Sequence, residues 1–228
     1  AKPAAAATAL PTVDQVLDKY VEALGGKAAL EKQTSRSAKG TFEIPAMGMS
    51  GTLRTFDKAP NMTSTNIDLA GVGAITIVFN GKQAWQQDPM TGLREMSGPE
   101  LAMMKIEGEF YAPLKLKSLY KSVEVKGKEK VGGAEAYLVE ALPAEGSPVK
   151  MYFDVTSGLL VRREAEQDSP QGKMPTELLL EEYRVVDGVK IPFVMKTNTP
   201  AMSFVIKIEE VKHNIAIDDA KFAKPSGQ

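Results

Sequence analysis

The sequence predicts a mainly β (α+β) protein in which an antiparallel sheet is accompanied by two helices, and three observations support this fold class. Residues 147–166 read SPVKMYFDVTSGLLVRREAE and alternate apolar with polar residues on both sides of a short turn, as a β-hairpin does. Similar segments, separated by Gly, Pro, Asn and Asp, occur before and after this hairpin. Amphipathic helical patterns occur near the N-terminus and in the middle of the chain.

The hairpin is recognised by its alternation and by its turn. Every second residue from Val149 to Val155 is apolar, so these side chains share one face of a strand. Gly158 in the turn is free to adopt a positive φ. Simple alternation in the second strand places Leu160 on the opposite face from Arg163. We therefore expect a sheet that is apolar on one face and partly covered on the other.

The first helix is predicted by a capping box of Thr12 and Gln15, and its apolar stripe ends at Gly25-Gly26. A central helix is predicted from a second capping box, with Ser97 as N-cap and Glu100 reaching back, and it runs to about Phe110. Its apolar residues form two stripes, Met103/Ile106/Phe110 and Leu101/Met104/Tyr111. Two stripes indicate that this helix contacts two surfaces, since packing on one sheet requires a single stripe.

About eleven strands are expected around these helices. Asn80-Gly81 is the strongest turn signal, because both positions tolerate the positive φ of a type I′ turn. The Lys-rich stretch 115–130 is interpreted as a solvated edge strand. Near the end, Asp218-Asp219 predicts a turn whose following Phe222 packs back on the fold. The predicted strands are 35–45, 49–58, 61–70, 73–80, 82–87, 134–142, 148–155, 159–167, 176–186, 189–198 and 202–212.

Charge and composition restrict the function. The 228 residues carry 28 Lys and Arg against 29 Asp and Glu, so we expect no nucleic-acid partner. No run of about 18 apolar residues occurs, so no segment has the composition of a membrane-spanning helix. In the absence of a linker or an internal repeat, residues 11–228 are expected to form a single domain.

The N-terminus indicates export. Residues 1–10 are rich in Ala and lack apolar periodicity, so we expect a disordered tether. The chain does not begin with Met, as in a mature protein whose signal peptide has been removed. We therefore expect a periplasmic or secreted protein. A lipid-anchored form is an alternative, in which the tether is the spacer behind a lipidated Cys.

No catalytic motif emerges. The chain has one histidine, His213, and no cysteine, which disfavours a nucleophilic triad and a zinc site. The adjacent acid pairs, such as Glu181-Glu182, would point to opposite faces of a strand and could not act together. We expect no enzymatic activity, no cofactor and no metal.

Eleven methionines are the one compositional oddity. Three interpretations compete: ordinary core packing, an adaptable surface for acyl chains or apolar partners, and soft copper sites built from thioethers.

Four stretches resemble the outer-membrane lipoprotein-sorting family of periplasmic carriers and the related bacterial lipid-carrier lipoproteins. They are DKYVEALGGKAALEKQTSRSAKGTFE, YFDVTSGLLVRRE, EEYRVVDGVKIPF and VKHNIAIDDAKFAKP, covering roughly residues 14–43 and 149–225. The resemblance implies a curved, incompletely closed antiparallel half-barrel whose apolar concave face is covered by helices. It also implies a carrier that binds a lipid, a lipoprotein acyl chain or another hydrophobic molecule, with transient contacts to a membrane or an envelope protein.

A wide apolar face on a curved sheet must be filled by its own side chains or by a ligand. Two further hypotheses therefore stay open: a non-enzymatic envelope protein with a packed interior that acts through protein contacts, and an enzyme with an unrecognised site. The residues expected to line a ligand cavity are Leu101, Met103, Met104, Ile106, Phe110, Val149, Met151, Phe153, Ile191, Phe193, Met195, Met202, Phe204 and Ile206.

Overall fold

The computed structural model describes residues 9–169 and 172–226. Most of the expected tether, residues 1–8, lies outside the described residues. None of the helices in the described ranges combines the length and the apolarity that crossing a membrane would require.

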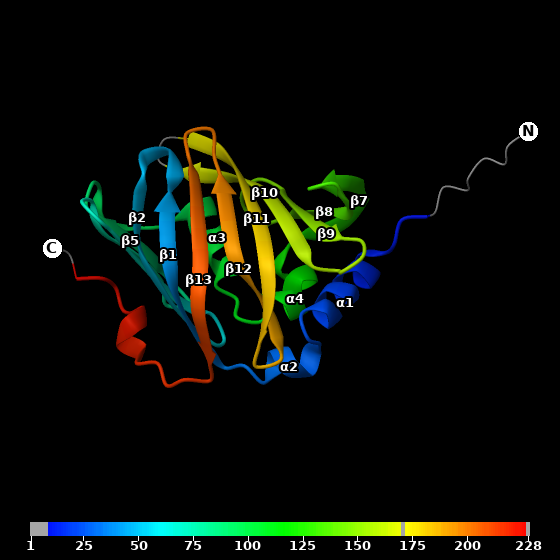
Figure 1. The fold of residues 1–228 in the computed structure, drawn as a ribbon, viewed down its shortest axis with the longest axis horizontal. Coiled ribbons are helices and arrows are strands. Elements are labelled where there is room, and N and C mark those ends of the chain that lie inside the picture. Colours follow the sequence, from blue (N-terminus) through cyan, green and yellow to red (C-terminus); the bar gives the residue numbers. More distant parts are fainter. Residues whose placement is uncertain (1–8, 170–171, 227–228) are drawn as a thin grey trace, which may run out of the picture.

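The described residues form one antiparallel sheet of thirteen strands with helices packed against it (Figure 1). The helices are α1 (Val13–Ala23), α2 (Lys27–Glu31), α3 (Gly98–Glu107) and α4 (Ala112–Leu119), with short 3-10 turns η1 (Pro45–Met47) and η2 (Asp219–Phe222). The strands are β1 (Ser35–Ile44), β2 (Met49–Lys58), β3 (Met62–Leu69), β4 (Gly73–Phe79), β5 (Ala84–Asp88), β6 (Gly92–Glu95), β7 (Ser122–Val131), β8 (Ala134–Leu142), β9 (Val149–Asp154), β10 (Leu160–Ser169), β11 (Gly172–Val186), β12 (Val189–Asn198) and β13 (Ser203–His213).

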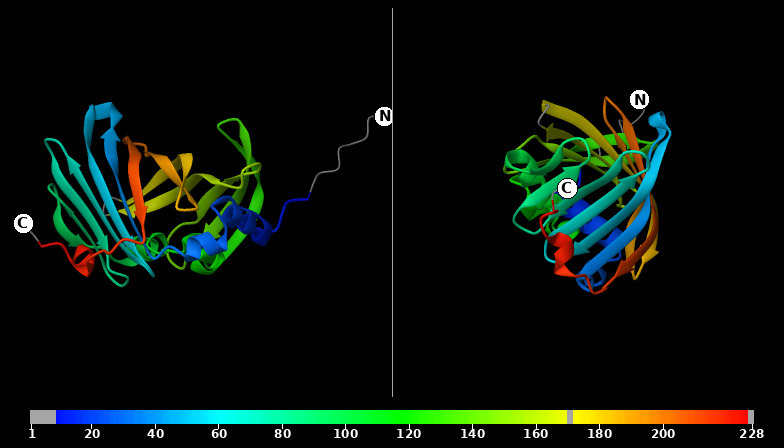
Figure 2. Two further views of the ribbon diagram at one scale, coloured as in Figure 1. Left: turned by 60° about the horizontal axis from the view of Figure 1, so that its bottom comes forward. Right: turned by 90° about the vertical axis from the view of Figure 1, so that its left-hand side faces the viewer.

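The sheet is an open half-barrel, as predicted. Its strand order is β6-β5-β4-β3-β2-β1-β13-β12-β11-β10-β9-β8-β7, so β6 and β7 are edge strands and the barrel does not close. Figure 2 shows the resulting trough in two views. Register shifts at Lys39/Gly40, Val125/Gly127 and Leu160/Arg162 interrupt three of the ladders, and such irregularities bend and twist strands.

The two faces of the sheet are distinguished by the register of its strands. Val139, Met151, Arg163, Leu178 and Thr197 are paired in turn across β8 to β12, and directly opposed side chains share a face. We call the face that carries this row the inner face. It is the concave side of the trough, on which α1 and α3 pack.

Four hydrophobic clusters among the described residues hold the fold together, one of which lies between α3 and strands β4 and β5. On the inner face, α1 packs through Leu17 and Tyr20 against Met151 and Phe153, and the Tyr20 and Phe153 rings meet edge to face at 5.1 Å. A second cluster joins β1–β3 with β12 and β13. A third, on the outer face, is closed by the C-terminal segment, whose Phe222 is 2% exposed and packs with Val78, Trp85 and Ile217. The prediction for Phe222 is thus confirmed.

Local signals in the sequence are largely confirmed. Thr12 and Gln15 form the predicted reciprocal capping box. The β9–β10 hairpin is present, and Gly158 has φ +76° in its turn, where the Asp154 carboxylate accepts hydrogen bonds from the Thr156 and Ser157 N–H groups. The two-stripe helix does contact two surfaces: Leu101 and Met104 pack on a cluster at β4 and β5, while Met103 packs toward β10.

Other local predictions were wrong. A tertiary contact explains the first error below, and local hydrogen bonds explain the last. Residues 115–119 are helical in α4, since Leu116 is buried against α1, and the edge strand begins at Ser122. Strand β6 was missed; with the edge strand it raises the predicted eleven strands to thirteen. Asn80 has no positive φ, because its side chain accepts hydrogen bonds from Lys82 and Gln83 N–H instead.

The alternation in β10 was also misjudged. The register shift between Leu160 and Arg162 places Leu160 opposite Phe153, on the same inner face as Arg163. Ser97 is the N-cap of α3, but its side chain makes no capping hydrogen bond. The Glu100 carboxylate, predicted to complete that capping box, is bound to Arg94.

Candidate functional site

A cavity of about 730 Å³ lies on the inner face between two walls of the trough. One wall is β4–β6, which contributes Ile77, Gln86, Asp88 and Arg94; the opposite wall is β10–β12, which contributes Arg163, Ala165, Met174, Thr176, Leu178 and Thr197. The loop at residues 145–147 forms part of its rim. Because β4–β6 and β10–β12 stand on opposite sides of the half-barrel, the cavity is a product of sheet curvature.

Helix α3 is the third wall and contributes Pro99, Glu100, Met103, Met104 and Glu107 to the lining. The helix is anchored to β4 and β5 by Leu101 and Met104, which pack on Phe79, Ala84 and Met96. Gly108 at the end of α3 also lies against β4, since a Cβ there would come within 2.5 Å of the Phe79 ring. These contacts position the remaining face of α3 over the trough.

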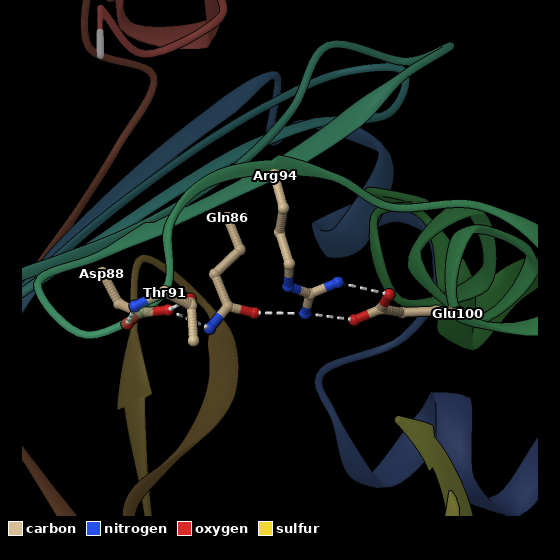
Figure 3. A network of polar contacts seen from close by, with 5 residues as sticks. All are labelled: Gln86, Asp88, Thr91, Arg94 and Glu100. Atoms are coloured by element: carbon tan, nitrogen blue, oxygen red, sulfur yellow. Dashed lines mark hydrogen bonds and ion pairs between the residues drawn. The ribbon is translucent and has the colours of Figure 1, made fainter. Parts of the chain in front are cut away.

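The start of α3 is tied to β6 by a polar network (Figure 3). Arg94 donates to both carboxylate oxygens of Glu100, at 2.7 and 2.6 Å, and to the Gln86 Oε1 atom at 2.6 Å. The hydrogen bond from Arg94 to Glu100 raises the pKa of Arg94 above its ordinary value. Gln86 in turn donates to Asp88, whose pKa is lowered chiefly by a hydrogen bond from the Thr91 hydroxyl. The hydrogen bonds of this network therefore stabilise the charged forms of Arg94 and Asp88.

The end of α3 is tied to the opposite wall by a second ion pair. Arg163 on β10 donates from Nη1 to Glu107 Oε1 at 2.8 Å and from Nη2 to the Met103 Sδ atom at 3.2 Å. Burial opposes the charged form of Arg163, but the attraction of Glu107 and Tyr120 and the hydrogen bond to Glu107 together raise the pKa of Arg163 above its ordinary value. Helix α3 therefore bridges the trough, held at each end by an Arg–Glu pair whose carboxylate belongs to the helix.

The fourteen residues expected to line a cavity lie in several places. Met103 and Met104 line it. Leu101 packs between α3 and β4, and Ile106 is half-buried on α3. Phe110 meets the Tyr111 ring edge to face, beneath the Arg36 guanidinium.

The remaining predicted residues, except Met202, face the rest of the trough. Val149, Met151 and Phe153 are at most 3% exposed and are covered by α1. Ile191, Phe193, Met195, Phe204 and Ile206 belong to the second inner-face cluster. Met202 is exposed in the turn between β12 and β13.

The polar lining was missed by sequence reasoning, in particular Arg94 and Arg163. For Arg163 a signal existed: it is a charged residue on the otherwise apolar face of a predicted strand, with Ala165 two positions on. Arg94 gave no comparable signal, because β6 has only four residues and was not predicted.

His213, the one histidine, lies at the end of β13 beside Asp187, with 3.1 Å between Nδ1 and Oδ2, and burial lowers its pKa.

Other features of the described residues suit a ligand less well. A depression of about 850 Å³ between α1, α2 and α4 is lined mainly by charged side chains, namely Asp18, Glu22, Lys27, Glu31 and Lys115. The described ranges contain no group of three or more His, Cys, Asp or Glu residues placed to hold a metal ion. The cavity under α3 is therefore the candidate site.

Comparison with known sequences gives no family: no family model matches the chain, and no curated protein matches it. Comparison with solved structures does find similar folds. A LolA superfamily protein from Nitrosomonas europaea superposes with a TM-score of 0.63 at 13% identity, over 94% of this chain and 99% of that one.

Two further structures share this architecture. A DUF1329 family protein from Desulfovibrio piger matches with a TM-score of 0.61 at 16% identity, over 92% of this chain and 97% of that one. A domain described as an outer membrane lipoprotein-sorting protein, from Vibrio parahaemolyticus, matches with a TM-score of 0.57 at 12% identity, over 84% and 90% of the two chains. The likeness predicted from the sequence is thus confirmed at the level of the fold: the chain has the same open half-barrel fold as these three structures.

Proposed function

We propose that this chain is a non-enzymatic carrier of the bacterial cell envelope that binds a lipid, a lipoprotein acyl chain or another hydrophobic molecule in the cavity under α3. The observation that carries the proposal is the cavity itself. A packed half-barrel would fill its trough with side chains, whereas here β4–β6 and β10–β12 stand apart beneath a helix that is fixed at both ends. Its volume is within the range of small-molecule sites.

The lining suits a ligand of variable shape. Met103, Met104 and Met174 supply flexible thioethers, and Leu178 and Ile77 supply aliphatic surface on the two walls. Burying an acyl chain of about 16 carbons would contribute on the order of 12 kcal/mol before the costs of association, at about 0.8 kcal/mol per CH₂. This leaves room for useful affinity without a covalent step or a metal.

The comparisons support the proposal through the fold alone. Proteins with this half-barrel include one described by its role in lipoprotein sorting, which is a reason to expect an apolar cargo and an envelope location for this chain. The same reasoning extends to partners: a lipid-modified protein and a transient contact with a membrane or an envelope protein are part of the proposal.

The proposal is tested by uptake of the neutral fluorescent probe N-phenyl-1-naphthylamine, with native mass spectrometry to detect co-purified lipid. Leu178→Trp should fill the cavity and lower the affinity for the probe by about tenfold or more, because Leu178 lines it. Leu179→Trp is the matched control on the same strand. Leu179 is paired with Arg162 on the outer face, so the affinity should stay within about twofold of the wild type.

Two results would count against a carrier. The first is a wild-type protein that carries no lipid and gives no saturable probe signal, which would favour the alternative of an envelope protein that acts through protein contacts. The second is an equal loss in both tryptophan variants, which would show that the probe binds elsewhere.

A further inference from the structure

The two arginines of the cavity differ in how many hydrogen bonds their guanidinium groups donate to oxygen atoms. Arg94 donates three hydrogen bonds to oxygen atoms, two to Glu100 and one to Gln86. Arg163 donates one hydrogen bond to an oxygen atom, on Glu107. Its second acceptor is the thioether of Met103, a weak acceptor, and its buried Nε has no hydrogen-bond partner among the described residues.

The unused donors of Arg163 lie together. Nε and Nη2 form one edge of the guanidinium, and this edge is the fork that binds two oxygens of a carboxylate or phosphate. In the structure the thioether of Met103 occupies the Nη2 position. Met103 lines the cavity and has a flexible side chain, so a ligand that displaces it would gain access to the fork.

The surroundings of Arg163 define the rest of the ligand. Leu178 is its direct cross-strand neighbour, Ala165 follows it on the same face, and both line the cavity. A ligand that reaches Arg163 with an oxyanion therefore lies along apolar surface with the rest of its length. This combination of one charged end and an apolar body describes an amphiphile.

The other charges of the cavity limit the headgroup. Glu100 and Glu107 are each paired with an arginine, and Glu166 is paired with Lys173 at 3.5 Å. Asp88 and Glu145 add two further acidic groups to the lining. A headgroup with several negative charges would be repelled by them, whereas a single charge can be balanced by Arg163.

We propose that the cavity takes an amphiphile with one negative charge on its headgroup, such as a fatty acid or a phosphodiester lipid, and that the Nε–Nη2 edge of Arg163 receives this charge when Met103 moves aside. The assignment rests on the carrier function proposed above and names the class of its ligand.

The test measures displacement of N-phenyl-1-naphthylamine by dodecanoate, by dodecan-1-ol, which has the same chain without the charge, and by acetate, which has the charge without the chain. The wild type should bind dodecanoate about tenfold or more tightly than dodecan-1-ol, since a charge-assisted fork is gained. Acetate should displace nothing at the concentrations at which dodecanoate acts. Arg163→Gln should lower the preference for dodecanoate over dodecan-1-ol about tenfold, because the charged fork is lost while the apolar surface remains.

Arg162→Gln is the matched control. Arg162 is the preceding residue on β10, but its guanidinium stacks over the Tyr152 ring at 4.1 Å and pairs with Glu164, away from the cavity lining. The preference for dodecanoate should be unchanged in this variant. If Arg163→Gln does not fold, as judged by circular dichroism, Arg163→Lys keeps the charge without the fork and should still lower the affinity for dodecanoate by about threefold or more.

The outcomes separate this assignment from the carrier function. Equal wild-type affinity for dodecanoate and dodecan-1-ol, or an equal loss of both ligands in Arg163→Gln, would overturn the assignment and leave the carrier intact. Displacement by acetate would overturn it as well, because the site would then bind an anion without a chain. If the wild type bound neither the probe nor dodecan-1-ol, the carrier function would fail and the assignment with it.

Discussion

Tyr20 shows how one buried side chain connects a helix to the sheet. Its ring packs on Phe153 of β9 from α1, and both belong to the cluster that fills this end of the trough. The neighbouring Tyr183 donates its hydroxyl hydrogen bond to the Leu160 carbonyl at 2.7 Å. Phe153, expected from the sequence to line a cavity, is 1% exposed beneath α1. An apolar residue on the inner face is thus either buried under a helix or exposed to the cavity, depending on what covers it.

Because Tyr20 is buried, the unfolding free energy should decrease with pH in the alkaline range. Burial raises the pKa of Tyr20 to about 12, whereas an unfolded tyrosine ionises near its ordinary value of about 10. The unfolded chain then loses a proton that the folded chain keeps, so this contribution is fully present below pH ~10 and is lost as the pH rises toward ~12. Between about pH 10 and 12 the unfolding free energy of the wild type should decrease with pH more steeply than that of Tyr20→Phe, by about 1.4 kcal/mol per pH unit. Urea unfolding at several pH values measures both dependences. Equal dependences in the two proteins would contradict the prediction.

Helix α3 organises the candidate site because it contacts both walls. Leu101 and Met104 fix it to β4 and β5, while Met103 and Glu107 meet Arg163 on β10. Neither Arg–Glu pair is fully exposed: side-chain exposure is 28% and 20% for Arg94 and Glu100, and 19% and 44% for Arg163 and Glu107. A helix held in this way can close the trough without filling it.

The two stripes of α3 should respond differently to charge. Leu101→Glu places a carboxylate among the apolar side chains of Phe79, Ala84 and Met96, and should lower the unfolding free energy by about 3 kcal/mol or more. Met103→Glu places it beside Arg163, which can pair with it, so the loss should stay below about 1 kcal/mol. Urea unfolding of the two variants measures both. Equal losses would show that α3 is simply buried core.

At the scale of the whole molecule, one continuous sheet holds four separate clusters of described residues. The inner face carries three, under α1, along β1–β3 with β12 and β13, and under α3 at β4 and β5, and the outer face carries the fourth, under the C-terminal segment. The first helix, α1, packs into one of these clusters, and its capping box starts at Thr12. Residues 11–228 are therefore proposed to form a single domain.

A chain beginning at Pro11 should melt within about 2 °C of the full chain, because the capping box and every α1 contact remain. Differential scanning calorimetry measures the change. As a control, a chain beginning at Gln15 lacks the Thr12 cap and should melt several degrees lower, since loss of such a cap costs about 1 kcal/mol. A fall of many degrees in the Pro11 chain would place part of the first ten residues in the fold.

Elements whose stabilising partners are close along the chain could be predicted from the sequence. The capping box joins Thr12 to Gln15, and the β9–β10 turn binds Asp154 to Ser157 and ends at Gly158. Period-two alternation likewise identified most strands and hence the β-rich fold class. These features depend on hydrogen bonds and side-chain spacing over a few residues, so they can be read locally.

The position of the cavity and the residues that face it depend on contacts between distant parts of the chain, which the sequence alone does not reveal. Arg163 and Glu107 are 56 positions apart, and Ile77 and Leu178 line the same cavity from opposite walls because the sheet curves between β4 and β11. The register shift before Arg162 reassigned Leu160 to the inner face, which simple alternation could not foresee. The physical reason is that alternation specifies two faces but not what covers them: α1 closes over Phe153, while α3, held between Arg94 and Arg163, leaves a cavity.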